Sequence, residues 1–354
     1  MKYSHGGDIH TARRNSPDSR IIDFSANINP LGLPDSVKEA IIESVPDIIN
    51  YPDPHNTELI EALSVFEGVS ASSFICGNGA ADLIFRAVFA LRPKKALLLS
   101  PCFSEYESAL RASGCEIAYY GLLRENRFRL TEDFLEVLNE EHDMLFVCSP
   151  NNPTSRLADP GLLERILDRC AECGTAAVID ECFLDFAENG EKLSMKNRQG
   201  RVLVLKAFTK IFSMPGMRLG YGITHDREML EAIEQISQPW AVSLPAQRAG
   251  AAALKNKDFI TESRKYVKQQ SIRLQSAFAG LGFEVFRPDA NFILFRTQNA
   301  QTYLKELSER GILMRDCSNF RGLDNSYLRC AVRSKEDNEV LIDALNEIFH
   351  TVIR

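Results

Sequence analysis

The sequence contains no apolar stretch that approaches the roughly 20 residues needed for a membrane-spanning helix. Its opening segment, MKYSHGGDIHTARRNSPDSR, includes no apolar core of the kind that a secretory signal carries. Basic residues are not in excess either, because 41 Lys and Arg stand against 48 Asp and Glu, for a net charge of -7. We therefore expect a cytoplasmic protein whose main partner is neither a membrane nor a nucleic acid.

Metal-binding patterns are also missing from the sequence. Cys170 and Cys173 form a CxxC, but no second CxxC accompanies it for zinc, and the pair ends a helical pattern, whereas a redox pair needs a helix N-terminus. The nine cysteines are odd in number and mostly lie in apolar stretches, as buried free thiols in a reducing compartment do. We expect no metal site.

What the sequence does contain is an alternation of short apolar segments with amphipathic helical ones. The apolar segments between residues 74 and 223 are FIC, KALLLS, CEIAYY, MLFVCS, TAAVID, RVLVLKAF and RLGYGI. Such a rhythm of strands and helices predicts an α/β fold, with a mostly parallel seven-stranded sheet covered by helices on both faces.

The pattern changes after Pro239. Helices are predicted over 244–255 and 259–281, followed by short strands, one of them over 312–316, and a final helix from Ser334. This texture predicts a smaller α+β domain. We expect residues 51–240 to form a large domain and residues 241–354 to supply the linking helices and the small C-terminal domain. Residues 1–50 should pack on the small domain or at a dimer interface.

Candidate binding residues follow the predicted strands, at the sheet edge where ligands of parallel sheets collect. In GNGAAD, the backbone N–H groups of Ala80 and Ala81 open a helix and could bind a phosphate, although a simple strand-to-helix turn fits equally well. Phe103 could stack on a planar ring or pack in the core. Asn152, in PNNPT, could donate to a ring oxygen or a carboxylate, or form an Asx-turn.

Three charged residues add to these candidate binding residues. Asp180 closes an apolar strand, where a carboxylate is costly unless it meets a cation such as a protonated ring nitrogen, or caps a helix. Lys210 and Arg218 lie in FTKIFSMPGMRLGYG, a mostly apolar run. A lysine that loses its charge beside an anion-binding arginine suits a Schiff-base cofactor that carries a phosphate. The combination predicts pyridoxal phosphate, with Lys210 as the Schiff-base lysine and Asp180 on the ring nitrogen.

In these motifs the chain resembles the fold type I pyridoxal phosphate enzymes of the aspartate aminotransferase superfamily. Within them it is similar to the group that contains histidinol-phosphate aminotransferases and threonine-phosphate decarboxylases. The stretches HGGDI (5–9), DFSANINPLG (23–32) and MRDCSNFRGLDNSYLRCAVRS (314–334) look like the decarboxylases of cobalamin biosynthesis. Phe183, where the aminotransferases usually have tyrosine, points the same way.

The resemblance implies roles for further residues. Asn152 and Arg329 would hold a substrate carboxylate. The substrate phosphate would be held by His5, the backbone at Gly6, Asn27 and Arg315. Tyr51 would reach the cofactor phosphate of the neighbouring subunit, so the active unit should be a homodimer.

Two positions depart from the usual family pattern. Ala207 replaces a serine or threonine that contacts the cofactor phosphate, and Ser155 replaces a glycine. We count Thr209, just before the lysine, among the cofactor-binding candidates.

The implied reaction is decarboxylation of threonine phosphate to aminopropanol phosphate. An aminotransferase acting on histidinol phosphate or another amino acid is the first alternative, and a non-catalytic binding protein of the same fold is the second. Serine phosphate stays open as a substrate, because a single methyl group separates it from threonine phosphate.

Overall fold

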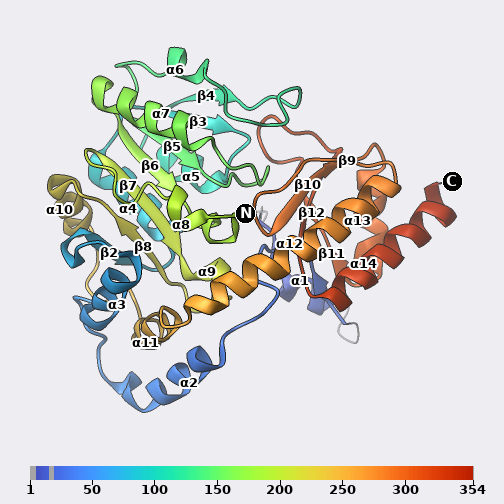
Figure 1. The fold of residues 1–354 in the computed structure, drawn as a ribbon, viewed down its shortest axis with the longest axis horizontal. Helices are drawn as coiled ribbons and strands as arrows, with labels where there is room; N and C mark the ends of the chain where they lie inside the picture. Colours follow the sequence, from blue (N-terminus) through green and yellow to red (C-terminus); the bar gives the residue numbers. More distant parts are fainter. Residues whose placement is uncertain (1–4, 16–19, 354) are drawn as a thin grey trace.

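Seven strands, almost all of them buried along their length, pair into one sheet in the larger half of the molecule (Figure 1). The computed structural model describes residues 5–15 and 20–353. In their order across the sheet the strands are β2 (Phe74–Gly77), β8 (Gly220–Ile223), β7 (Val202–Ala207), β6 (Ala176–Asp180), β5 (Met144–Cys148), β3 (Lys95–Ser100) and β4 (Glu116–Gly121). Only β8 runs antiparallel to its neighbours. The predicted mostly parallel seven-stranded α/β sheet is therefore confirmed.

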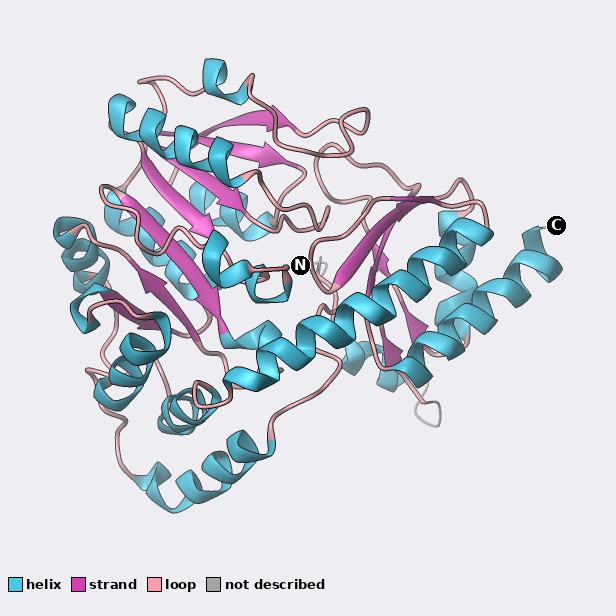
Figure 2. Ribbon diagram, in the orientation of Figure 1, coloured by secondary structure: helices cyan, strands magenta, loops and turns pink. Residues whose placement is uncertain are grey.

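Helices cover both faces of this sheet (Figure 2). Along β3, Leu97 and Leu99 enter one hydrophobic core, whereas Ala96 and Leu98 enter the other. The first core includes apolar side chains of α7 (Pro160–Cys173), and the second includes those of α4 (Ala80–Leu91), α5 (Ser104–Ala112) and α10 (Arg227–Gln235). Burial on both faces explains why the strands read as continuous apolar runs, and it leaves their carboxyl ends as the place for polar chemistry.

A smaller antiparallel sheet lies beside the large one. Its strands, in order, are β12 (Arg315–Asp316), β13 (Tyr327–Ala331), β10 (Phe292–Arg296) and β9 (Glu284–Val285). The long helix α12 (Lys257–Gly280) runs from beside the large sheet to the small one, where α13 (Ala300–Glu309) and α14 (Lys335–Ile348) also lie (Figure 1). This helix therefore links the two sheets.

The strand predicted over 312–316 is divided between two sheets. Ile312–Leu313 form β11, which pairs in parallel with β1 (Ile22–Asp23) from the N-terminal segment, and the next strand, β12, pairs with β13. The apolar pattern is continuous here, but the pairing partner changes at Met314, and a sequence pattern carries no information about the partner.

The segment 131–140 also reads as one amphipathic helix in the sequence, but only α6 (Phe134–Val137) is helical. The side chain of Asn139 accepts a hydrogen bond from the backbone N–H of Glu141 at 3.0 Å. Local bonds of this kind compete with the helix and favour a turn.

The remaining helices are short. They are α1 (Ile9–Asn15), α2 (Asp35–Ser44), α3 (Thr57–Glu67), α8 (Gly190–Leu193), α9 (Phe208–Ile211) and α11 (Leu244–Ala253), with η1 (Val45–Ile49), η2 (Ala71–Ser73), η3 (Leu184–Phe186) and η4 (Phe349–Ile353). In the described part of the chain, no helix combines the length and the apolar character needed to cross a bilayer.

A buried ion network fixes α3 against the strands that carry the candidate site. The carboxylate of Glu67, 5% exposed, accepts from Lys206 Nζ at 2.9 Å, Lys196 Nζ at 2.8 Å and the Tyr221 hydroxyl at 2.6 Å. Burial alone would raise the pKa of Glu67, but the Lys206 ammonium and the other donors outweigh it and lower this pKa to about 2. Glu181, next to Asp180, has its pKa raised to about 7 by burial.

We predict that Glu67→Gln lowers the free energy of unfolding by about 3 kcal/mol at pH 7, because it leaves the Lys206 ammonium buried without its main counter-charge. The folded-state pKa lies below the ordinary value of 4.5, so the contribution is complete above that value and is lost as the pH falls towards 2. Urea denaturation at several pH values measures both effects. The control Glu39→Gln, on the exposed side of α2, should change stability by less than about 0.5 kcal/mol. A loss for Glu67→Gln as small as that of the control would contradict the network's role.

Candidate active site

Lys210 lies on α9, the short helix that directly follows β7. Its side chain is partly buried, and its Nζ lies 5.6 Å from the centre of the Phe183 ring. Loss of hydration, together with the guanidinium groups of Arg329 and Arg218, lowers the pKa of Lys210 to about 8. Within the described residues nothing hydrogen-bonds this amine. An amine with a lowered pKa and no hydrogen-bond partner among the described residues is suited to covalent or proton-transfer chemistry.

Asp180 ends β6, the strand next to β7, and is 6% exposed. Its Oδ2 accepts from the Tyr106 hydroxyl at 2.6 Å and its Oδ1 from the backbone N–H of Cys182 at 2.9 Å. Both donors are neutral, and the two carboxylate oxygens still have acceptor capacity. Tyr106 was not predicted as a site residue. It lies three positions after Phe103 on the first turn of α5, and this spacing is the only signal in the sequence.

The N-terminus of α4 and the side chain of Arg218 lie side by side, where they could bind an anion together. Ala80 and Ala81 open this helix without a side-chain cap, directly after Gly79 with φ of 83°. A Cβ at Gly79 would lie 2.5 Å from Arg218 Nη2, so the guanidinium occupies the space beside the first turn. Free N–H groups at a helix start and an adjacent guanidinium both favour a phosphate.

Arg329, on β13, reaches across from the small sheet to the large one. It is 5% exposed, its Nη1 donates to Asn152 Oδ1 in the loop after β5, and its Nη2 donates to the backbone oxygen of Ser25 at 2.7 Å. Its Nε is buried with no partner among the described residues. Burial lowers the pKa of Arg329 to about 10. A desolvated guanidinium whose Nε has no partner in the described part of the chain fits an anionic ligand such as a carboxylate.

Arg315 lies directly opposite Arg329 in the register of β12 and β13. Its Nη2 donates to Asn319 Oδ1 at 2.8 Å, and burial lowers its pKa. Two like charges that face each other across a strand pair repel. The pair is therefore a second reason to expect an anion at this position, and a doubly charged one would suit it best.

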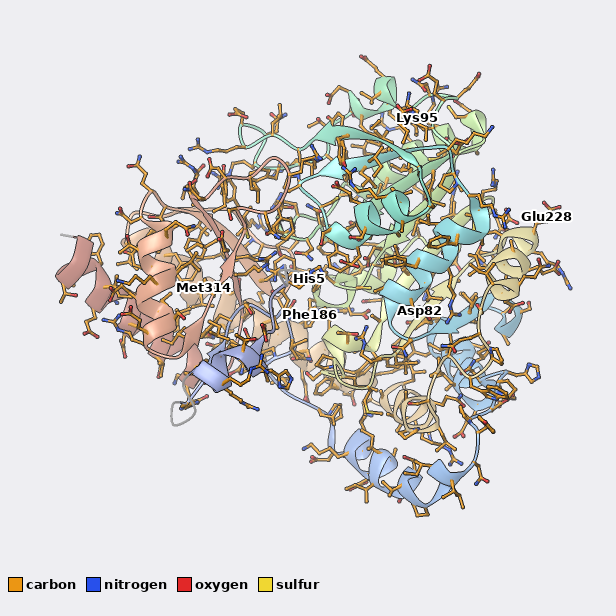
Figure 3. The ribbon with its side chains drawn as sticks, turned by 180° about the vertical axis from the view of Figure 1, so that it is seen from behind. His5, Asp82, Lys95, Phe186, Glu228 and Met314 are labelled. Carbon is orange, nitrogen blue, oxygen red and sulfur yellow. The ribbon has the colours of Figure 1, made fainter. Side chains whose placement is uncertain are left out.

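The N-terminal segment adds three of the predicted substrate residues. His5 Nε2 lies 2.8 Å from Glu105 Oε1, and its ring centre lies 5.8 Å from that of Phe103. Gly6 packs so closely that a Cβ would approach the backbone oxygen of Ser25 to 2.1 Å. Asn27 is 2% exposed, and its Oδ1 has no partner within the described residues. Figure 3 labels His5 in the middle of the molecule, between the two halves.

Two predicted residues are not brought into this group. Tyr51 is 78% exposed and stacks on Trp240, with ring centres 4.5 Å apart. The resemblance assigns Tyr51 to a neighbouring subunit, so its role stays a prediction. Thr209 is partly buried, and its hydroxyl has no hydrogen bond in the part of the chain that the structure describes. Across residues 5–15 and 20–353, no cluster of His, Cys, Asp or Glu is arranged to hold a metal ion.

We predict that the Lys210 amine, in protein freed of small molecules, reacts with an acetylating reagent with a midpoint near pH 8. Arg329→Gln should move this midpoint to higher pH, because it removes a neighbouring positive charge. Peptide mass spectrometry across a pH series measures the reaction at this position. Arg227→Gln, an exposed arginine on α10, should leave the midpoint unchanged. A wild-type midpoint above pH 10 would contradict the prediction.

Comparisons with known proteins agree with this geometry. Residues 19–345 match the family model described as aminotransferase class I and II. The chain is 37% identical over 352 residues to threonine-phosphate decarboxylase of Salmonella typhimurium, covering 98% of this chain and 96% of that protein. It is 30% identical to the adenosylcobalamin biosynthesis bifunctional protein CobDQ of Leptospira interrogans, covering 98% of this chain and 41% of that protein.

A solved structure is similar as well. The histidinol-phosphate aminotransferase from Clostridium acetobutylicum superposes with a TM-score of 0.87 at 28% identity, covering 93% of this chain and 99% of that one. Because the family model matches most of its length, this chain belongs to the aminotransferase class I and II family.

Proposed function

We propose that this protein is a pyridoxal phosphate-dependent decarboxylase of L-threonine O-3-phosphate, which releases carbon dioxide and (R)-1-amino-2-propanol phosphate for cobalamin biosynthesis. The observation that carries the proposal is the buried guanidinium of Arg329, whose Nε has no partner among the described residues and which, after loss of hydration, helps to lower the pKa of Lys210. The similarity to a decarboxylase and to an adenosylcobalamin biosynthesis protein supports the same substrate and pathway.

The residues present fit the cofactor. Arg218 and the N–H groups of Ala80 and Ala81 would hold its phosphate, with Thr209 as a further hydroxyl donor. Asp180 would accept from the ring nitrogen, and the Tyr106 hydroxyl and the Cys182 amide hold its carboxylate in place. Phe103 would stack on the ring. When bound here, pyridoxal phosphate would supply an electron sink for the pair released when a bond at the substrate Cα breaks.

The substrate groups have separate binding partners. Arg329 and Asn152 would hold the carboxylate, using the guanidinium N–H that is otherwise unsatisfied. Arg315, His5, Asn27 and the backbone at Gly6 would hold the phosphate.

The way the carboxylate is held decides which bond breaks. Arg329 and Asn152 would orient the carboxylate so that the bond between Cα and the carboxylate breaks and carbon dioxide leaves. The amine of Lys210, with a pKa near neutrality, then returns a proton to Cα. The product keeps its phosphate.

The assembly would be a homodimer in the cytoplasm, with Tyr51 of each chain reaching the cofactor phosphate of the other. The exposed apolar side chains around Tyr51, including Ile48 and Ile49, support an interface there. Within one chain, residues 51–240 would form the cofactor-binding domain and residues 241–354 the linking helices and small domain. Residues 1–50 would complete the phosphate site from the N-terminal segment.

An aminotransferase acting on histidinol phosphate is the alternative, and the similarity to the Clostridium acetobutylicum enzyme favours it. The same cofactor-binding residues would serve, but histidinol phosphate has no carboxylate, so the Cα–H bond would be the one that breaks. The two reactions differ in one requirement, since only the aminotransferase needs a keto acid as amino acceptor.

The proposal predicts carbon dioxide and aminopropanol phosphate from threonine phosphate with no keto acid added. Lys210→Ala should abolish turnover and leave some cofactor bound noncovalently. Gas release and mass spectrometry of the product measure the reaction. Strict dependence on 2-oxoglutarate would establish the aminotransferase instead. No change in cofactor absorbance with either phosphorylated substrate would indicate a binding protein.

We further predict that Arg315→Ala reduces kcat/KM for threonine phosphate on the order of 100-fold or more, because a charged hydrogen bond to the phosphate is lost. The much slower reaction of unphosphorylated threonine should change little. Steady-state kinetics with both substrates make the comparison. Equal losses for the two would remove Arg315 from the phosphate site.

A further inference from the structure

The turn that carries Lys210 cannot hold its own shape. α9 has only four residues, and within the turn Lys210 O accepts from the backbone N–H of Phe212 and of Ser213. An isolated helical segment of this length is unstable, because fixing the first turn costs more than its few hydrogen bonds return. The position of the lysine must therefore be set by contacts from elsewhere in the chain.

Asn29, from the N-terminal segment, supplies those contacts. Its backbone N–H donates to Lys210 O at 3.2 Å, and its Nδ2 donates to Ile211 O at 2.6 Å. The hydroxyl of Ser213 donates to Asn29 O at 3.0 Å. Asn29, which is 3% exposed, is thus hydrogen-bonded to Lys210, Ile211 and Ser213.

The same side chain also reaches the long helix between the two sheets. Asn29 Nδ2 donates to Ser263 Oγ at 2.7 Å, and Ser263 Oγ donates to Phe259 O within α12 at 2.6 Å. Asn29 therefore joins the N-terminal segment, α9 and α12 at a single point. Its own Oδ1 is occupied by the backbone N–H of Leu31 at 3.1 Å, so both ends of the amide are used.

The segment that ends at Asn29 also contacts the other side of the site. Four residues earlier, Ser25 O accepts from Arg329 Nη2 at 2.7 Å. Between these two positions lies Asn27, whose buried Oδ1 has no partner among the described residues. Residues 25–29 thus form a bridge between the arginine of the small sheet and the lysine of the large one.

We propose that Asn29 is a positioning residue, which holds the Lys210 amine at a fixed place relative to Arg329 through the bridge of residues 25–29. The proposal rests on the function proposed above, in which Lys210 must meet a substrate held by Arg329. Asn29 would act on the amine indirectly, through its hydrogen bonds to the turn that carries Lys210.

A purely structural role would give a different result from a positioning role. If Asn29 only contributed to packing, its removal would lower stability and leave the chemistry of the lysine unchanged. If it positions the lysine, its removal lets the amine gain hydration and move away from the neighbouring guanidinium groups. The basicity at this nitrogen then rises. Rate also falls, because small displacements of a reacting group are costly.

The test compares Asn29→Ala with Asn338→Ala in the holoenzyme. Asn338 is a matched control, because it is also a buried asparagine, 0% exposed, whose Nδ2 donates to Gln270 and to a backbone oxygen in the small-domain region. The readouts are the pH midpoint of the cofactor absorbance change, hydrogen exchange of the peptide covering 208–213, the melting temperature, and kcat and KM for threonine phosphate.

We expect Asn29→Ala to raise the absorbance midpoint by about 0.5 pH unit or more and to speed exchange over 208–213. We expect kcat to fall about 10-fold or more with a smaller change in KM. Asn338→Ala should lower the melting temperature but leave the midpoint, the exchange and kcat near wild type. An Asn29→Ala protein that loses stability alone, like the control, would overturn the proposal.

Ser263→Ala provides a milder second variant, because it removes one of the two acceptors of Asn29 Nδ2 and keeps Ile211 O. We expect the same changes in smaller measure, and if Asn29→Ala does not fold, an unchanged midpoint in Ser263→Ala overturns the proposal. Failure of the proposed function would show differently, as a wild-type protein without cofactor absorbance or without turnover.

Discussion

The site depends on positive charges that are held close together, with Arg329 buried and Lys210 and Arg315 half-buried. Arg315 and Arg329 face each other across β12 and β13, and Lys210 is close enough to Arg329 for its pKa to fall. In the described structure Arg329 donates to an amide oxygen and a backbone carbonyl rather than to a carboxylate. A buried guanidinium whose Nε has no partner among the described residues favours the binding of an anion.

The buried network around Glu67 uses charge for stability, in contrast to the charges of the candidate site. There, two ammonium groups and a tyrosine hydroxyl converge on one carboxylate, and the charges are satisfied within the chain. This network joins α3 to the strands β7 and β8 through Lys206 and Tyr221. A satisfied network stabilises one arrangement of the strands, whereas the unsatisfied groups at their ends are left for a ligand.

Three parts of the chain must meet before the site exists. The large sheet contributes Lys210 and Asp180, the small sheet contributes Arg329, and the N-terminal segment crosses between them with its backbone bonded to both. The helix α12 joins the same point through Ser263. Residues 25–29 therefore connect the small sheet to the turn that carries Lys210. Ser25, Asn27 and Asn29 are buried in this connection.

The sequence alone determined the seven strands, and it placed Lys210, Asp180, Arg218 and the Ala80–Ala81 helix start at their ends, because a short apolar run, a following helix and a charge within an apolar run are local signals. It did not identify Tyr106, whose partner Asp180 lies 74 positions away, or Asn29, whose partner Ser263 lies 234 positions away. The division of residues 312–316 between two sheets was likewise invisible, since the apolar pattern does not name a pairing partner. The opposition of Arg315 and Arg329 is a matter of strand register. Only the tertiary structure decides register and pairing, because both are set by packing between segments that are distant along the chain.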